Sequence, residues 1–208
     1  MSQIHYNTSK NKALDNYKEL MPPVVSQNKV GLSLHESTPY FAKGKFRVVA
    51  AKNKHIHEVT RNLRKQDRDE IHNLEKFSGS SRTIEKVIAE SLKFTELNLA
   101  LLENDTPIAF GGVAAQNNFD DTWLCPWLLG SHKLENNLAA FRFLKLFFNK
   151  YIALKHQRLI NITFCRENSL NIKWLKSLRF SVFPLNKENL RADEKDEPWV
   201  FFINKNFC

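Results

Sequence analysis

The sequence predicts an α+β fold, in which helices flank a mixed sheet and an extended N-terminal arm precedes the folded part. Three patterns lead to this prediction. A buried, strand-like run at 159–165 is followed by a turn and an amphipathic helix at 168–180. Two apolar runs, 97–103 and 107–114, flank a polar turn, which is typical of a β-hairpin. Apolar residues at helical spacing dominate the stretch between the first strand-like run and this hairpin.

The other elements follow from the same periodicities. A strand begins at Phe46, where β-branched residues follow a glycine-containing turn. Asp67 is expected to cap a helix with Glu70 as its reciprocal partner, and Gly79 is expected to end that helix. Pro126 indicates either a bulge or a strand edge that lacks a donor. The predicted strands are 46–51, 97–103, 107–114, 122–130, 159–165 and 198–204, and the predicted helices are 55–65, 67–79, 82–94, 137–156 and 168–180.

Composition limits the class of protein. The chain has 208 residues, of which 42% are hydrophobic and 25% charged, so it is long and apolar enough to form a packed core. The formal net charge of +9 favours anionic partners such as nucleic acid, phosphate-bearing cofactors or acidic protein surfaces. No apolar run is long enough for a membrane span, and the first residues lack the apolar core of a secretory signal. Three widely spaced cysteines favour a reducing cytoplasm over a disulfide framework.

Residues 1–45 differ from the rest and are expected to form an arm, whereas residues 46–208 form the folded domain. The arm is polar and has one short helical candidate, at 10–20. Its apolar positions, among them Tyr40 and Phe41, are candidates for docking onto a surface. A tail without such contacts is the alternative.

Four segments carry a resemblance to known proteins: LRKQDRDEI (63–71), PIAFGGV (107–113), WLLGSHKL (127–134) and NSLNIKWLKSLRF (168–180). In this order they resemble a small group of phage proteins with the acyl-CoA N-acyltransferase (GNAT) fold. The resemblance implies a mixed, mainly antiparallel central sheet flanked by helices. The group includes a protein of short-tailed coliphages linked to internal virion proteins. It therefore implies location in the virion or the host cytoplasm, and contacts with other phage structural proteins through the arm.

An acetyltransferase of this fold holds a diphosphate with a glycine-rich loop between the fourth strand and the long helix, because glycines let backbone N–H groups approach the phosphates. The corresponding junction, 128–137, has a single glycine, Gly130, and Glu135 places a negative charge near the helix start. We therefore expect no cofactor, with acetyl-CoA as the alternative. If acetyl-CoA binds, the resemblance assigns its contacts to Leu129, Gly130, Ser131, His132 and Lys133.

The proton donor of the family is also missing. Many enzymes of this fold use a tyrosine of the last helix to protonate the departing thiolate, and the resemblance places Leu175 at that position. A leucine cannot transfer a proton. Arg179 replaces the glycine that usually ends this helix in a left-handed conformation. No catalytic residue is assigned.

Other polar residues have a functional and a structural interpretation. His132 lies in the altered loop and is a candidate ligand contact or base; a solvent-facing histidine is the alternative. Arg64, Asp67 and Glu70 are spaced so that they line one side of a cleft. The alternative is that Asp67 and Glu70 form the helix cap and Arg64 pairs at the surface.

Two further site types are weaker. His55 and His57 resemble a metal-binding pair, but no further ligands lie nearby in the sequence, so no metal is expected. Basic residues of the long helix and its end favour either a solvated face or a nucleic-acid surface; these are Arg142, Lys145, Lys150, Lys155 and Arg158.

The first functional hypothesis is a virion-associated or particle-assembly protein of a phage, built on a degenerate GNAT scaffold and without catalysis. The alternative is an acetyl-CoA-dependent N-acetyltransferase that modifies a host or phage protein. Nucleic-acid binding remains open because of the positive charge.

Overall fold

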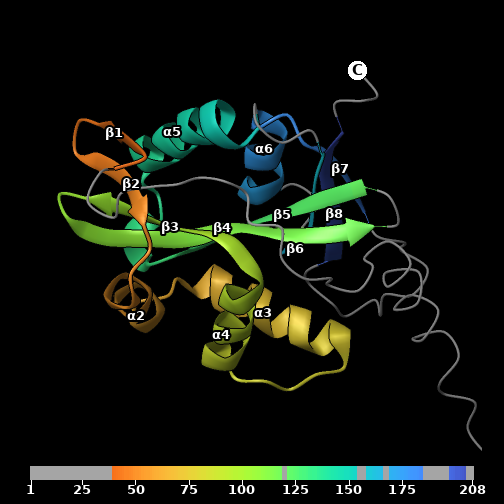
Figure 1. The fold of residues 1–208 in the computed structure, drawn as a ribbon. Coiled ribbons are helices and arrows are strands. Elements are labelled where there is room, and N and C mark those ends of the chain that lie inside the picture. The colour runs from red at the N-terminus through yellow and green to blue at the C-terminus, as the bar shows by residue number, and fades with distance from the viewer. Residues whose placement is uncertain (1–38, 119–120, 154–157, 166–168, 185–196, 205–208) are drawn as a thin grey trace, which may run out of the picture.

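A computed structural model describes residues 39–118, 121–153, 158–165, 169–184 and 197–204. These residues form one eight-stranded sheet with the order β1-β2-β3-β4-β5-β6-β8-β7. Helices α2, α3 and α4 cover one face of the sheet, and α5 and α6 cover the other (Figure 1). All neighbouring strands are antiparallel except β5 and β6. No helix in the described ranges is long and apolar enough to cross a membrane.

The strands are β1 (Phe41–Lys43), β2 (Phe46–Ala50), β3 (Thr95–Glu103), β4 (Thr106–Asn118), β5 (Asp121–Gly130), β6 (Arg158–Cys165), β7 (Ser181–Pro184) and β8 (Glu197–Asn204). The helices are α2 (Asn53–Arg61), α3 (Lys65–Ser78), α4 (Ile84–Phe94), α5 (Leu138–Phe147) and α6 (Leu170–Ser177), with a 3₁₀ turn η1 (His132–Leu134) and a π-helical turn η2 (Phe148–Ile152).

Local signals placed several ends correctly. The β3–β4 hairpin turns at Asn104 and Asp105, both with positive φ, as the polar turn predicted. Helix α3 ends at Gly79 in the left-handed conformation, also as predicted. Its start differs from the prediction: Arg64 is the N-cap residue, and Asp67 lies inside the first turn.

The described end of the arm belongs to the sheet. Residues of β1 pair with β2, from Phe41↔Val48 to Lys43↔Phe46. The Phe41 ring stacks on Phe143 of α5 with centroids 5.0 Å apart, and Tyr40 packs against the same core. Tyr40 and Phe41 therefore belong to the core of the fold. The helical candidate at 10–20 lies outside the described residues.

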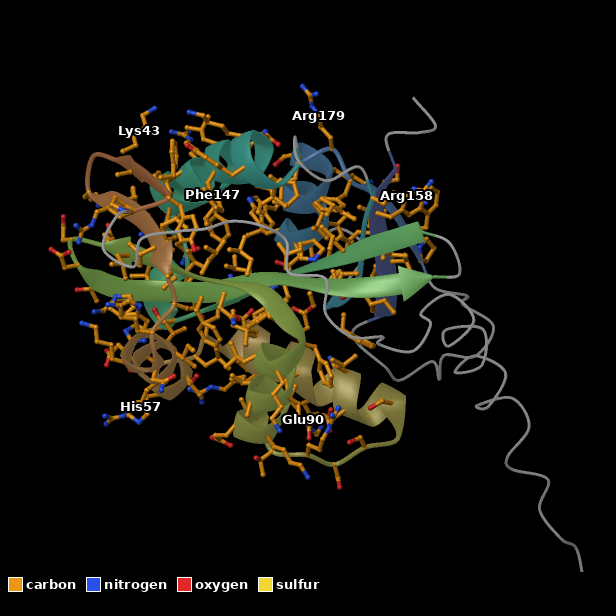
Figure 2. All side chains as sticks on the ribbon, in the orientation of Figure 1. Lys43, His57, Glu90, Phe147, Arg158 and Arg179 are labelled. Carbon is orange, nitrogen blue, oxygen red and sulfur yellow. The ribbon has the colours of Figure 1, made fainter. Side chains whose placement is uncertain are left out.

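The core on the α5 side is largely aromatic. Phe147 of α5 stacks on Tyr151 of η2 with centroids 5.3 Å apart; Phe147 is buried in the core (Figure 2), and Tyr151 packs against it. Phe180, just after α6, meets Phe201 of β8 edge to face at 5.0 Å. These rings bury large apolar areas, which fixes α5 and α6 on the sheet. The predicted helix 137–156 corresponds to α5 followed by η2, and its last residues, 154–156, lie outside the described residues.

The end of α6 is strained. Arg179 has φ +70°, the left-handed conformation that the missing glycine would adopt without strain. The chain then turns into β7, which pairs with β8 from Ser181↔Phe202 to Pro184↔Trp199. None of the predicted strand ranges covers β7.

Strands β5 and β6 part soon after they meet. Their parallel pairing is described at Leu124↔Leu159, near the start of both strands. Two residues further along both strands, a side chain connects them in place of a backbone hydrogen bond: Asn161 Nδ2 donates to the Pro126 carbonyl at 2.9 Å. The β4–β5 register runs unbroken through Val113↔Pro126, so Pro126 is not at a bulge. It lies at a strand edge without a donor, which was the other predicted possibility.

Candidate functional site

The edge of β5 beyond Pro126 is covered by the connection between α2 and α3. In an extended strand, the N–H and C=O of one residue point to the same side. Gly130 uses this side for residues 62–64 instead of β6. The Arg64 N–H donates to the Gly130 carbonyl at 2.9 Å, and the His132 N–H donates to the Asn62 carbonyl at 2.9 Å. Leu63 and Ser131 are opposite each other in this short bridge.

Asp67 completes this contact from inside α3. Its Oδ2 accepts the Gly130 N–H at 2.6 Å, and its side chain is completely buried. The Arg64 guanidinium binds the same carboxylate in bidentate fashion, with Nε–Oδ2 at 2.7 Å and Nη2–Oδ1 at 2.8 Å. Arg64 is 8% exposed. The prediction that Asp67 caps the helix and Arg64 pairs at the surface is therefore wrong, because tertiary contacts with β5 bury both groups.

The backbone amides that follow β5 also have internal acceptors. The Ser131 N–H donates to the Ile108 carbonyl at 2.9 Å, and the Ser131 hydroxyl donates to the same oxygen at 3.1 Å. The Leu134 N–H donates to the Ser131 carbonyl at 2.9 Å. The amides of Gly130, Ser131 and His132 are thus all satisfied within the protein. This segment does not fit a coenzyme A diphosphate, which needs such amides free and pointing outward.

Gly130 has a packing role in this arrangement. A Cβ at this position would lie 2.5 Å from Cδ2 of Leu134, and the Leu134 side chain is fully buried. The absence of a side chain at Gly130 therefore makes room for Leu134. It does not open a path for a ligand.

The remaining predicted cofactor contacts do not form one surface. Leu129 is half-buried and packs on an apolar cluster beside α2, α3 and α4. His132 and Lys133 are exposed in η1. The start of α5 is capped by Asn137, whose Oδ1 accepts the Ala140 N–H at 3.1 Å. The five predicted residues are therefore adjacent in sequence but face in different directions.

Glu70 lies one turn after Asp67 and contacts the other parting strand. The Thr163 hydroxyl and the Phe164 N–H of β6 donate to its carboxylate. Burial raises the pKa of Glu70 to about 7, and the Asp67 charge adds to this. These two carboxylates of α3 thus contact the two strands that part from each other: Asp67 binds β5, and Glu70 binds β6. The spacing of Arg64, Asp67 and Glu70 was the sequence signal for this group.

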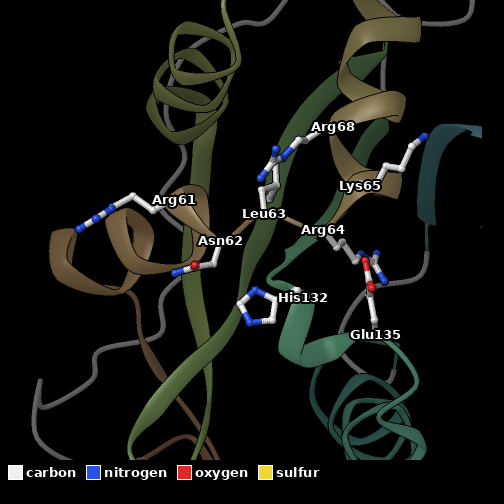
Figure 3. Close-up of a pocket in the computed structure, with 8 residues that line it drawn as sticks. All are labelled: Arg61, Asn62, Leu63, Arg64, Lys65, Arg68, His132 and Glu135. Carbon is white, nitrogen blue, oxygen red and sulfur yellow. The ribbon is translucent and has the colours of Figure 1, made fainter.

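A cavity of about 310 Å³ adjoins this group at the corner between α2 and α3 (Figure 3). The η1 turn closes its other side, so His132 lies at the cavity, as the ligand-contact interpretation required. The residues that line it are Arg61, Asn62, Leu63, Arg64, Lys65, Arg68, His132 and Glu135.

Other candidate residues have structural roles. Leu175, at the position of the family's tyrosine, is buried in α6. The His55 Nδ1 accepts the Lys52 N–H at 3.2 Å near the start of α2, whereas His57 is exposed. Within the described ranges, no group of three His, Cys, Asp or Glu side chains gathers. The Lys150 ammonium group lies over the rings of Phe41 and Tyr151, so it makes cation–π contacts within the fold.

Comparisons with known proteins identify the fold. No protein-family model and no curated protein sequence matches the chain. Among solved structures, an acetyltransferase of Agrobacterium tumefaciens is 11% identical with a TM-score of 0.53, over 83% of this chain and 98% of that chain. The ribosomal-protein-S18-alanine N-acetyltransferase of Escherichia coli is 12% identical with a TM-score of 0.49, over 76% and 92%.

The protein yncA of Salmonella typhimurium, solved with its cofactor acetyl-CoA, is 11% identical with a TM-score of 0.49, over 78% of this chain and 95% of that chain. The likeness to the Agrobacterium tumefaciens structure shows that the chain has the GNAT fold, as predicted. At this level of identity the likeness concerns the fold alone.

Proposed function

We propose that this chain is a GNAT scaffold that works by binding and not by acyl transfer, as a virion-associated or assembly protein of a phage particle. The observation that carries the first half is the Gly130 N–H bound to Asp67 at 2.6 Å. The Gly130 N–H is thereby bound within the protein, at the position where an acetyltransferase of this fold would present a backbone N–H to a diphosphate.

The energetics support a closed segment. Binding a diphosphate here would break the hydrogen bonds that the backbone N–H groups of Gly130, Ser131 and His132 donate within the protein. A hydrogen bond to a charged group is worth about 1.5–3 kcal/mol and a neutral one about 0.5–1.5 kcal/mol. The buried Asp67 carboxylate would also lie close to the phosphates and repel them. No tyrosine stands at Leu175 to protonate a thiolate, which adds to the argument against transfer.

The phage role rests on the sequence resemblance, and the resembling segments can be located in the structure. Three of the four resembling segments meet around Gly130. The first segment contributes Arg64 and Asp67, the second contributes Ile108, and the third contributes Gly130 and Ser131. The resemblance therefore concerns one packed unit of the fold.

Partner binding is assigned to the arm. We propose that residues 1–45 contact other phage structural proteins, in the virion or in the host cytoplasm. Because β1 belongs to the sheet, a deletion of residues 1–38 removes most of the arm and leaves the β1–β2 hairpin intact.

Calorimetric titration with acetyl-CoA tests the absence of catalysis. The Salmonella typhimurium protein solved with acetyl-CoA is the positive control. We expect no saturable heat up to millimolar ligand. A micromolar affinity, about −8 kcal/mol, would overturn this half of the proposal.

Copurification with assembled particles tests the phage role. The full chain is expected in purified particles of the phage that encodes it. The chain without residues 1–38 is expected to be absent from them, while its thermal unfolding stays that of the full chain. Equal recovery of the two forms, or absence of both, would contradict the assignment.

Glu70 favours acetyl-CoA-dependent N-acetylation of a host or phage protein as the second candidate. A carboxyl group with a pKa near 7 is suited to accept a proton from an amine at neutral pH. Mass spectrometry of lysate proteins after incubation with acetyl-CoA tests this candidate. Acetylated products that are lost in Glu70→Gln and retained in Glu58→Gln, an α2 control, would favour the enzyme.

A further inference from the structure

We propose that the cavity at the corner of α2 and α3 binds a small phosphate ester. The cavity shares His132 and Glu135 with the junction 128–137. Its cations come from the α2–α3 corner, on the face of the sheet opposite α5 (Figures 1 and 3).

The lining is strongly cationic. Four of its side chains are Lys or Arg, against one carboxylate. Two of the cations already have acidic partners: Arg64 binds Asp67, and Lys65 binds Asp69 at 2.5 Å. Arg61 and Arg68 are exposed and, within the described part of the chain, have no acidic partner. These two guanidinium groups are therefore available to an anion.

Arg64 adds a donor that is already fixed in place. Asp67 holds its Nε and Nη2, and the Gly130 N–H holds Asp67 in turn. The third nitrogen, Nη1, has no partner in the described ranges. A guanidinium that is already buried and held loses little side-chain entropy when it binds a ligand. Arg64 thus provides a donor that is held in place, whereas the side chains of Arg61 and Arg68 are exposed.

The other side of the cavity supplies a weaker donor and a charge that limits affinity. The imidazole of His132 faces the space between α2 and α3 (Figure 3), and a neutral imidazole has one N–H to donate. The exposed carboxylate of Glu135 also lines the cavity and would repel a phosphate. Removal of this charge is therefore expected to strengthen binding, a response that a general loss of fold would not produce.

The size of the cavity narrows the ligand class. About 310 Å³ is at the small end of ligand pockets, which span roughly 300–1,000 Å³. It accommodates a phosphate with a sugar-sized group, and not a whole coenzyme. Two or three arginines around one small space suit the bidentate geometry of a phosphate better than that of a single carboxylate.

Amide NMR titration with ribose 5-phosphate tests the proposal, with ribose and sodium chloride at matched ionic strength as ligand controls. We expect saturable shifts at the amides of Asn62, Lys65 and His132 for the phosphate ester alone. Shifts spread evenly over other basic surfaces, or equal shifts with sodium chloride, would overturn the proposal.

Charge variants sharpen this test. Arg61→Gln and Arg68→Gln are each expected to weaken binding roughly fivefold, since each removes one exposed charge-assisted contact. Glu135→Gln is expected to strengthen it by a similar factor. Lys43→Gln, on β1 and away from the cavity (Figure 2), is the matched control and should bind as the wild type does. Equal weakening in Lys43→Gln would sink the proposal.

Two competitors separate this site from other binding modes. A short single-stranded oligonucleotide that displaces ribose 5-phosphate and binds at least tenfold tighter would overturn the small-ligand proposal. A coenzyme A signal that disappears in Arg68→Gln belongs to this cavity, because coenzyme A carries a phosphate ester. A coenzyme A signal that survives in Arg68→Gln would instead contradict the proposed function and leave this inference standing.

Discussion

The Asp67 carboxylate accepts the Gly130 backbone N–H at 2.6 Å, across 63 residues of sequence. This contact joins the first turn of α3 to the last residue of β5. It holds the edge of β5 where that strand parts from β6, and it orients Arg64 toward the neighbouring cavity. Both the proposed lack of acyl transfer and the proposed phosphate site depend on it.

Removal of Asp67 is expected to destabilise the fold strongly. Asp67→Ala leaves the Arg64 guanidinium buried without a partner and frees the Gly130 amide, which should cost about 3–5 kcal/mol. The control is Asp69→Ala, which breaks an exposed pair with Lys65 and should cost at most about 1 kcal/mol. Urea unfolding measures both free energies. Similar values for the two variants would show that the buried pair does not support the fold.

Glu70 should make stability depend on pH in an unusual direction. Its pKa is raised from 4.5 to about 7 in the folded protein, so the folded state binds the proton more tightly than the unfolded state. Its contribution is therefore complete below about pH 4.5 and is lost as the pH rises to 7. The loss is of order 3–4 kcal/mol, since one pKa unit corresponds to about 1.4 kcal/mol.

Glu70→Gln isolates this effect. The variant keeps the shape of the side chain and cannot ionise, so its free energy of unfolding should exceed that of the wild type at pH 8 and approach it at pH 5. Unfolding of both proteins at the two pH values measures the difference. A constant difference between the two proteins would show that Glu70 does not titrate in this range.

Gly130→Ala is expected to cost stability through crowding. The new methyl group would lie 2.5 Å from Leu134 Cδ2, and overpacking of this kind costs about 1–3 kcal/mol. The cost should shrink in a Leu134→Ala background, because the crowded atom is then absent. A double-mutant cycle of unfolding free energies measures this coupling. If the two changes are additive, Gly130 does not serve the packing of Leu134.

Arg179→Gly should stabilise the protein. Arg179 has φ +70°, a conformation that costs an arginine about 1 kcal/mol and a glycine almost nothing. The control is Lys176→Gly, an exposed position in the last turn of α6, which should cost about 1 kcal/mol. Thermal unfolding distinguishes the two changes, which should shift the melting temperature in opposite directions. A shift in the same direction would contradict the strain at Arg179.

Much of the fold was predictable because its signals are local. The hairpin turn at Asn104 and Asp105 and the helix stop at Gly79 depend on the conformations that single residues allow. Strand β1 was missed and β7 was given no residue range, since each is short and has no clear alternation of its own. Such strands exist because a neighbouring strand pairs with them, and the pairing partner is not visible in a local pattern.

The candidate site was predictable only in part. The spacing of Arg64, Asp67 and Glu70 predicted that the three residues line one side of a cleft; of the three, only Arg64 lines the cavity. Their partners on β5 and β6 were not foreseen. Capping was the simpler interpretation of Asp67 and Glu70, because it needs only residues that are close in sequence.

The sequence by itself determined the α+β class, the order of most helices and strands, and the lack of a glycine-rich loop after β5. These properties depend on hydrophobic period and residue type, which a linear chain displays directly. Only the tertiary structure decided that the lone glycine of this junction gives its amide to Asp67, and that Arg61, Arg64 and Arg68 line one cavity. Charge burial and hydrogen-bond partners depend on which distant segments pack together, and packing is decided by the whole core at once.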